Sequence, residues 1–206
     1  MVAEARTEHV QRPEPFFGRS EFYVEERRGS VKRHNEFAIY DGTGSRIGVL
    51  LQPVSVAMHF WRIFLRSSLL PFRFVIQDGQ GRRIASIRRG WTLLVSRTEI
   101  TDGSDNVIGY LKHKLRSRKP RLKIFNGEGK KIGEIAGTPG AWNMDIIDRE
   151  YISFGAITQD HRGDASAIKG KDVYRVLLTR EALEGLDRQV MLIAAIAIDR
   201  LLLENG

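Results

Sequence analysis

The stretch RLKIFNGEGKKIGEI, residues 121–135, contains an eight-residue phrase that recurs along the chain. The versions are DGTGSRIG from Asp41, DGQGRRIA from Asp78, DGSDNVIG from Asp102 and NGEGKKIG from Asn126. Asp-Gly or Asn-Gly between apolar runs is a strong hairpin signal, because Gly accepts a positive φ and the Asx side chain bonds to its own backbone. We therefore predict four β-hairpin tips.

The residues on both sides of each phrase favour β-strands. The segments before the phrases, such as FRFVI and RLKIF, are rich in β-branched and aromatic residues. Each phrase ends in Ile and a small residue, which is Gly48, Ala85, Gly109 or Gly133. Two residues further on, on the same side of the strand, come Leu50, Ile87, Leu111 and Ile135. The small residue followed by a large one on this face predicts that a bulky element packs against it. The hairpin repeats predict a mainly antiparallel β structure.

The C-terminal run RQVMLIAAIAIDRLLLENG, residues 188–206, contains nine consecutive apolar residues from Val190 to Ile198. This is far short of the ~20 residues that span a bilayer. Ala, Leu, Ile and Met favour a helix, and the helix would be apolar on nearly every side. We predict a central helix over about residues 185–203, with the sheet curled around it.

In combination, these pieces resemble the phospholipid scramblases and their relatives in the LURP-one-related and Tubby-like group. The resemblance runs from about residue 22 to 203 and is carried, in order, by Pro71-Phe72 with VIQDGQGRRI, IGY from Ile108, KIFNGEGKKI, FGAITQDHRG and MLIAAIAID. It implies a closed antiparallel β-barrel that surrounds a hydrophobic C-terminal α-helix. It also implies that the small residues after the turns, Gly48, Ala85, Gly109 and Gly133, let the strands approach this helix.

The length and composition indicate one domain. The 206 residues show no break in composition, so we expect a flexible arm over residues 1–18 and a single barrel domain over residues 19–206. The absence of cysteine excludes disulfides, thiolate metal sites and the cysteine-linked lipid anchor of the scramblases. The N-terminal residues do not resemble a secretory signal. We expect a cytoplasmic protein, peripheral on the inner face of the membrane.

The chain is basic, with 33 Lys and Arg against 25 Asp and Glu, which favours anionic partners. Lys112, Lys114, Arg116 and Arg118 alternate, so an extended strand would present all four on one face to phosphates or lipid headgroups. The predicted anion-binding residues are Lys112, Lys114, Arg116, Arg118, Lys119, Arg121 and Lys123. An equally weighted interpretation is a solvated hairpin whose charges prevent edge aggregation. A second basic group comprises Arg82, Arg83, Arg88 and Arg89.

The segment VAMHFWRIFLRSSLLP, residues 56–71, lacks the turn residues found elsewhere. As a helix it would be basic and aromatic, which is typical of segments that lie in a membrane interface. The residues for such a contact are Phe60, Trp61, Arg62, Phe64 and Arg66. The alternative, which we favour, is a connector that packs its apolar side on the barrel.

No catalytic or metal-binding motif stands out in the sequence. The five histidines are scattered without zinc-site spacing, and neither a nucleophile elbow nor a phosphate loop is present. AIKGKDVYRV, before the final helix, has a single acid, Asp172, where scramblases carry an acidic stretch, so we expect no calcium site. The leading hypothesis is a non-enzymatic protein without cofactor that binds anionic phospholipid headgroups peripherally. The alternatives are nucleic-acid binding or a protein-interaction scaffold that uses the same basic face.

Overall fold

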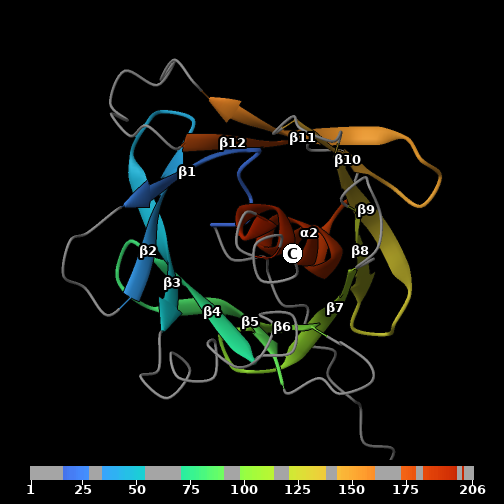
Figure 1. Cartoon of the computed structure of the whole chain (residues 1–206), viewed down its shortest axis with the longest axis horizontal. Helices are drawn as coiled ribbons and strands as arrows, with labels where there is room; N and C mark the ends of the chain where they lie inside the picture. Colours follow the sequence, from blue (N-terminus) through green and yellow to red (C-terminus); the bar gives the residue numbers. More distant parts are fainter. Residues whose placement is uncertain are drawn as a thin grey trace, which may run out of the picture.

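The computed structural model describes residues 16–27, 34–53, 71–90, 98–113, 121–137, 143–160, 173–179, 183–198 and 201. Within these residues, twelve antiparallel strands form a closed barrel and α2, Gly185–Ile196, is a helix (Figure 1). The strands are β1 Glu21–Arg27, β2 His34–Asp41, β3 Arg46–Pro53, β4 Phe72–Asp78, β5 Arg83–Arg89, β6 Thr98–Asp102, β7 Val107–His113, β8 Arg121–Asn126, β9 Lys131–Gly137, β10 Met144–Ile147, β11 Ser153–Asp160 and β12 Val173–Leu178.

Each strand pairs with its neighbour in sequence, and β1 also pairs with β12, which closes the ring. Figure 1 shows α2 in the middle of this ring. The apolar run from Val190 to Ile198 is fully buried, as is the strand face that carries Leu50, Ile87 and Leu111. The predicted mainly β barrel with its C-terminal helix is confirmed. Burial of the helix on all sides explains why its sequence is apolar on nearly every side.

Small residues after the turns leave room for α2, as the resemblance implied. A Cβ atom on Gly109 would lie 2.6 Å from Cγ1 of Val190, and one on Gly133 would lie 2.8 Å from Cε of Met191. Gly48 has a different neighbour, because its Cβ would meet the ring of Phe16 at 3.0 Å. The small positions therefore serve the N-terminal segment as well as the helix.

Tight turns with the same backbone hydrogen-bond pattern connect five strand pairs of the described chain. They begin at Asp41, Asp78, Asp102, Asn126 and Asp148. In each, the backbone N–H of the first residue donates to the carbonyl of the fifth at 2.9 to 3.0 Å. The four predicted hairpin tips are confirmed. The fifth, DREYISFG from Asp148, keeps the initial Asp and the Gly at the eighth position but lacks the turn glycines.

The conformational role of the turn glycines differs from the one predicted. The positive φ belongs to the fourth residue of each turn, and not to the glycine that follows Asp or Asn. These fourth residues are Gly44, Gly81, Asp105, Gly129 and Tyr151. The Asx side chain does bond to its own turn: Oδ1 of Asp78 accepts from the backbone N–H groups of Gln80 and Arg82, each at 2.9 Å.

The up-and-down order of the strands divides the connections between two ends of the barrel. The five tight turns all join an even-numbered strand to the next odd-numbered one, so they share one end, which we call the turn end. The strand ends at Pro53, Phe72, His113 and Arg121 lie at the opposite end.

Residues before β1 belong to the core. Phe16 and Phe17 are buried, although we expected residues 1–18 to form a flexible arm. The guanidinium of Arg188, at the start of α2, donates to the backbone carbonyls of Phe17, Arg19 and Thr179 at 2.9 to 3.3 Å. These bonds tie the helix, the N-terminal segment and the end of β12 together. The packed core of the described chain therefore includes Phe16 and Phe17.

Candidate functional site

The outer surface of β7, β8 and β9 carries the described part of the predicted basic ladder. Inward-facing Gly109 and Leu111 on β7 place Tyr110 and Lys112 outside, since successive side chains alternate. In the sheet register, Lys112 is the partner of Lys123, and Lys123 is the partner of Glu134. We define the β7–β9 face as Tyr110, Lys112, Arg121, Lys123, Phe125, Lys131 and Glu134.

Glu134 is a buried carboxylate in the middle of this face. Only 1% of its side chain is exposed, and it accepts hydrogen bonds from Arg121 at 3.1 Å and from Nζ of Lys131 at 3.0 Å. A buried carboxylate is tolerated when charged donors compensate its lost hydration. Glu134 therefore fixes Arg121 and Lys131 in place and offsets part of their charge.

Lys112 and Lys123 are the more available cations of the face. Both are exposed, and neither forms an ion pair with an acid of the described chain. Nζ of Lys112 lies 4.8 Å from the centre of the Phe125 ring. Because directly opposed residues have Cβ atoms about 5 Å apart, the two ammonium groups can reach one phosphate together.

Aromatic residues flank the two lysines. Tyr110 and Phe125 are cross-strand partners, each two residues from a lysine of the face and on the same side of the sheet. Both are half-buried. Sequence reasoning missed them because it considered only the segment from Lys112 to Lys123, which has no aromatic residue. The period of two along each strand was the signal that would have found them.

The other predicted site residues lie outside the described residues. They are Lys114, Arg116, Arg118 and Lys119 of the ladder, and Phe60, Trp61, Arg62, Phe64 and Arg66 of the proposed membrane contact. Their roles stay predictions. Of the seven predicted anion ligands, the fold brings Lys112, Arg121 and Lys123 onto one surface.

The second basic group is mostly neutralised. Arg82, Arg83 and Arg88 form ion pairs with Asp78, Asp105 and Glu99, at 2.8, 2.6 and 3.0 Å. Arg89 is buried inside the barrel, with its guanidinium carbon 4.6 Å from the centre of the Phe72 ring. These arginines therefore offer less positive charge to a partner than their number suggests.

Two turn carboxylates titrate below their ordinary range. Burial pushes the pKa of Asp78 upward, but hydrogen bonds from the backbone of Arg82 and Gln80 and from the Arg82 side chain outweigh it, so the pKa is lowered. For Asp41, burial likewise raises the pKa, and bonds from Thr43 and Ser45 with the nearby Arg19 lower it further than burial raises it. Both groups stabilise turns, which is a structural role.

The described residues provide neither a cluster suited to a metal ion nor a helix suited to cross a membrane. The His, Asp and Glu residues among them form no cluster of three or more that could hold a metal ion. No helix among the described residues is both long enough and apolar enough to cross a membrane.

Comparison with known proteins supports the fold. No protein-family model matches the sequence, and no curated protein matches it. The X-ray structure of a protein from Arabidopsis thaliana is similar, with a TM-score of 0.52 and 14% sequence identity over 91% of this chain and 96% of that chain. At this identity the likeness shows a shared fold.

Proposed function

We propose that the protein is a scramblase-like, Tubby-like barrel that binds anionic phospholipid headgroups at a membrane surface, without catalysis, through the β7–β9 face. The observation that carries the proposal is the opposed pair Lys112 and Lys123, which are exposed and form no ion pair with an acid of the described chain. A net charge of +8 adds a long-range attraction to an anionic surface.

The chemistry of the face suits a phosphate group. Each ammonium group is a strong donor and acts on a phosphate as a point charge. Arg121 adds a planar guanidinium beside them, already held by Glu134 at 3.1 Å. The backbone that carries these groups is already held in paired strands, so binding has to order only the side chains. Lys114, Arg116, Arg118 and Lys119 would extend the charge beyond β7.

The place of α2 argues for peripheral binding. Its apolar residues from Val190 onward are buried by the barrel, so they are used in the core and are not available to lipid. Contact with the membrane would then be made by side chains on the outside of the barrel. In this proposal the helix supports the fold, and lipid translocation is not part of the function.

Single-stranded nucleic acid is the second candidate ligand, and one observation favours it. Tyr110 and Phe125 lie beside Lys112 and Lys123 on the same face. Aromatic side chains next to cations are the arrangement on which bases stack while the backbone phosphates are bound. The half-burial of both rings, and the lysine over Phe125, leave less ring surface for stacking, which is why lipid remains the first proposal.

Vesicle co-sedimentation of the full chain tests the proposal. Phosphatidylcholine vesicles are compared with vesicles that also contain phosphatidylserine, at low and at physiological salt, with and without single-stranded or duplex DNA as competitor. We expect binding only to the anionic vesicles, weakened by salt and not displaced by DNA. No binding to the anionic vesicles would refute the lipid proposal, and displacement by single-stranded DNA would favour the second candidate.

A further inference from the structure

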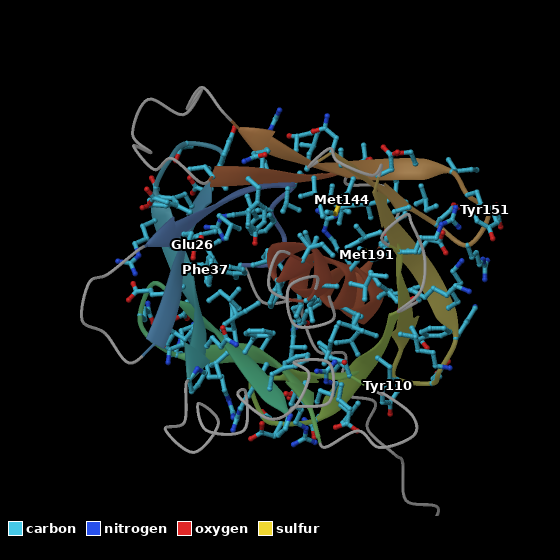
Figure 2. The ribbon with its side chains drawn as sticks, in the orientation of Figure 1. Glu26, Phe37, Tyr110, Met144, Tyr151 and Met191 are labelled. Atoms are coloured by element: carbon cyan, nitrogen blue, oxygen red, sulfur yellow. The ribbon has the colours of Figure 1, made fainter. Side chains whose placement is uncertain are left out.

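The turn between β10 and β11 ends in two exposed apolar side chains. Tyr151 is 66% exposed and Ile152 is 61% exposed. Figure 2 shows Tyr151 at the outer edge of the molecule, while Met191 lies within the barrel. Adjacent large apolar residues that remain mostly exposed at the tip of a hairpin contribute little to the core, so they indicate a surface that another molecule covers.

The equivalent positions of the other four described turns are polar or glycine. Where the β10–β11 turn has Tyr151, they have Gly44, Gly81, Asp105 and Gly129. Where it has Ile152, they have Ser45, Arg82, Asn106 and Lys130. The five turns share their backbone hydrogen bonds, so the turn itself does not require apolar residues.

Tyrosine at this position costs conformational energy. Tyr151 has a φ of +67°, in the left-handed region that a bulky side chain rarely adopts and that glycine adopts freely. A non-glycine residue held there stores strain, and such residues gather at functional sites. Because Tyr151 is exposed, packing in the core does not offset this cost.

The tip is continuous with the β7–β9 face. Nζ of Lys131 lies 5.1 Å from the centre of the Tyr151 ring and also bonds to Glu134, the strand partner of Lys123. Ile147, the last residue before the turn, is the strand partner of Glu134. Lys123, Glu134 and Ile147 therefore form one row across the sheet that leads to the tip.

We propose that Tyr151 and Ile152 insert into the interfacial region of an anionic phospholipid bilayer while Lys112 and Lys123 bind its headgroups; this inference rests on the proposed function. Tyrosine is favoured at the level of the headgroups, where its ring is apolar and its hydroxyl remains hydrated. Cations beside an exposed apolar tip match a surface that has anionic groups outside and apolar chains below. This charge arrangement favours a bilayer over a protein partner.

The test uses the double variant Tyr151→Gly/Ile152→Thr of the full chain. Leu177→Thr is the matched control, since Leu177 is also an exposed apolar residue, on β12, that the proposal leaves out of the contact. Three quantities are measured: partitioning into phosphatidylserine-containing vesicles, the pressure increase on insertion into a monolayer of the same lipids, and Tm. We expect the double variant to lose about tenfold in partitioning and most of the pressure increase.

The stability readout separates a lost contact from a damaged fold. Glycine relieves the positive φ, so Tm of the double variant should equal that of the parent protein or exceed it by about 2 °C. Leu177→Thr should partition and insert like the parent protein. If the parent protein binds the vesicles and the double variant binds equally well, the inference is wrong and the proposed function stands. The same holds if Leu177→Thr loses as much partitioning as the double variant. Absence of parent binding to the vesicles would overturn both.

Discussion

Gly133 on β9 faces Met191 on α2 so closely that a Cβ atom on the glycine would lie 2.8 Å from Cε of the methionine. The same Cβ would lie 2.5 Å from the backbone carbonyl oxygen of Ile147 on β10. Side chains can move away from such a clash, but the paired backbone of β10 cannot move without disturbing the sheet. The fit of helix and barrel therefore depends on particular glycines.

Gly133→Ala is expected to destabilise the barrel by about 1–3 kcal/mol, because an overpacked core must shift its backbone. In a domain of this size the loss lowers Tm by roughly 3–10 °C. Thermal unfolding followed by circular dichroism measures the change. Gly90→Ala is the control, since a Cβ at Gly90 meets no atom within 4 Å. An unchanged Tm for Gly133→Ala would show that β9 does not contact the helix as described.

Ala195→Asp is expected to prevent folding, because it buries an unpaired charge at the centre of the barrel, where Ala195 is fully buried. Leu186→Asp is the matched control. It adds the same charge to the same helix, but at a partly exposed position in the first turn, where a negative charge is favoured. Circular dichroism and hydrogen exchange report the outcome. A folded Ala195→Asp protein would place the helix outside the barrel.

Loss of the Asp78 bonds at low pH should destabilise the β4–β5 turn. The folded pKa of Asp78 lies below the ordinary value of 3.8, so the ionised form is preferred in the folded protein. Its stabilising effect is complete above about pH 4 and is lost as the pH falls through the lowered pKa. Asp78→Asn should lower Tm at pH 7 and converge on the parent protein as the pH falls through the lowered pKa. Glu150→Gln, at an exposed site in another turn, is the control. A difference in Tm between Asp78→Asn and the parent protein that stays constant from pH 7 to 2 would contradict the stabilising role of ionised Asp78.

The repeated turns and the buried helix were predictable because both depend on local chemistry. An Asx residue that bonds to its own turn can be recognised from a short stretch of sequence, and so can a helix that is apolar on every side. The turn at Asp148 was missed because Tyr151 stands where the other turns have Gly or Asp. The burial of Phe16 was also missed, because its contact with Gly48 joins segments far apart in the sequence.

The candidate site was predictable only in part. Alternation predicted one basic strand face that includes Lys112. The opposition of Lys112 to Lys123 and the pairing of Arg121 with Glu134 depend on strand register. Register is set by the turns and the core together, and no single segment encodes it. The sequence also suggested a second basic group that ion pairs largely neutralise, since partners such as Asp105 come from a neighbouring hairpin.

The most direct measurement of the central claim is the affinity of Lys112→Gln/Lys123→Gln for phosphatidylserine-containing vesicles. Each lysine near an anionic surface contributes about 1 kcal/mol, so the double variant should bind roughly 30-fold more weakly, with little change in Tm. The matched control Arg82→Gln/Arg88→Gln removes the same net charge from arginines already paired with Asp78 and Glu99, and should bind almost as the parent protein does. Equal losses in both double variants would mean that only net charge matters, and an unchanged affinity of Lys112→Gln/Lys123→Gln would contradict the assignment of the β7–β9 face.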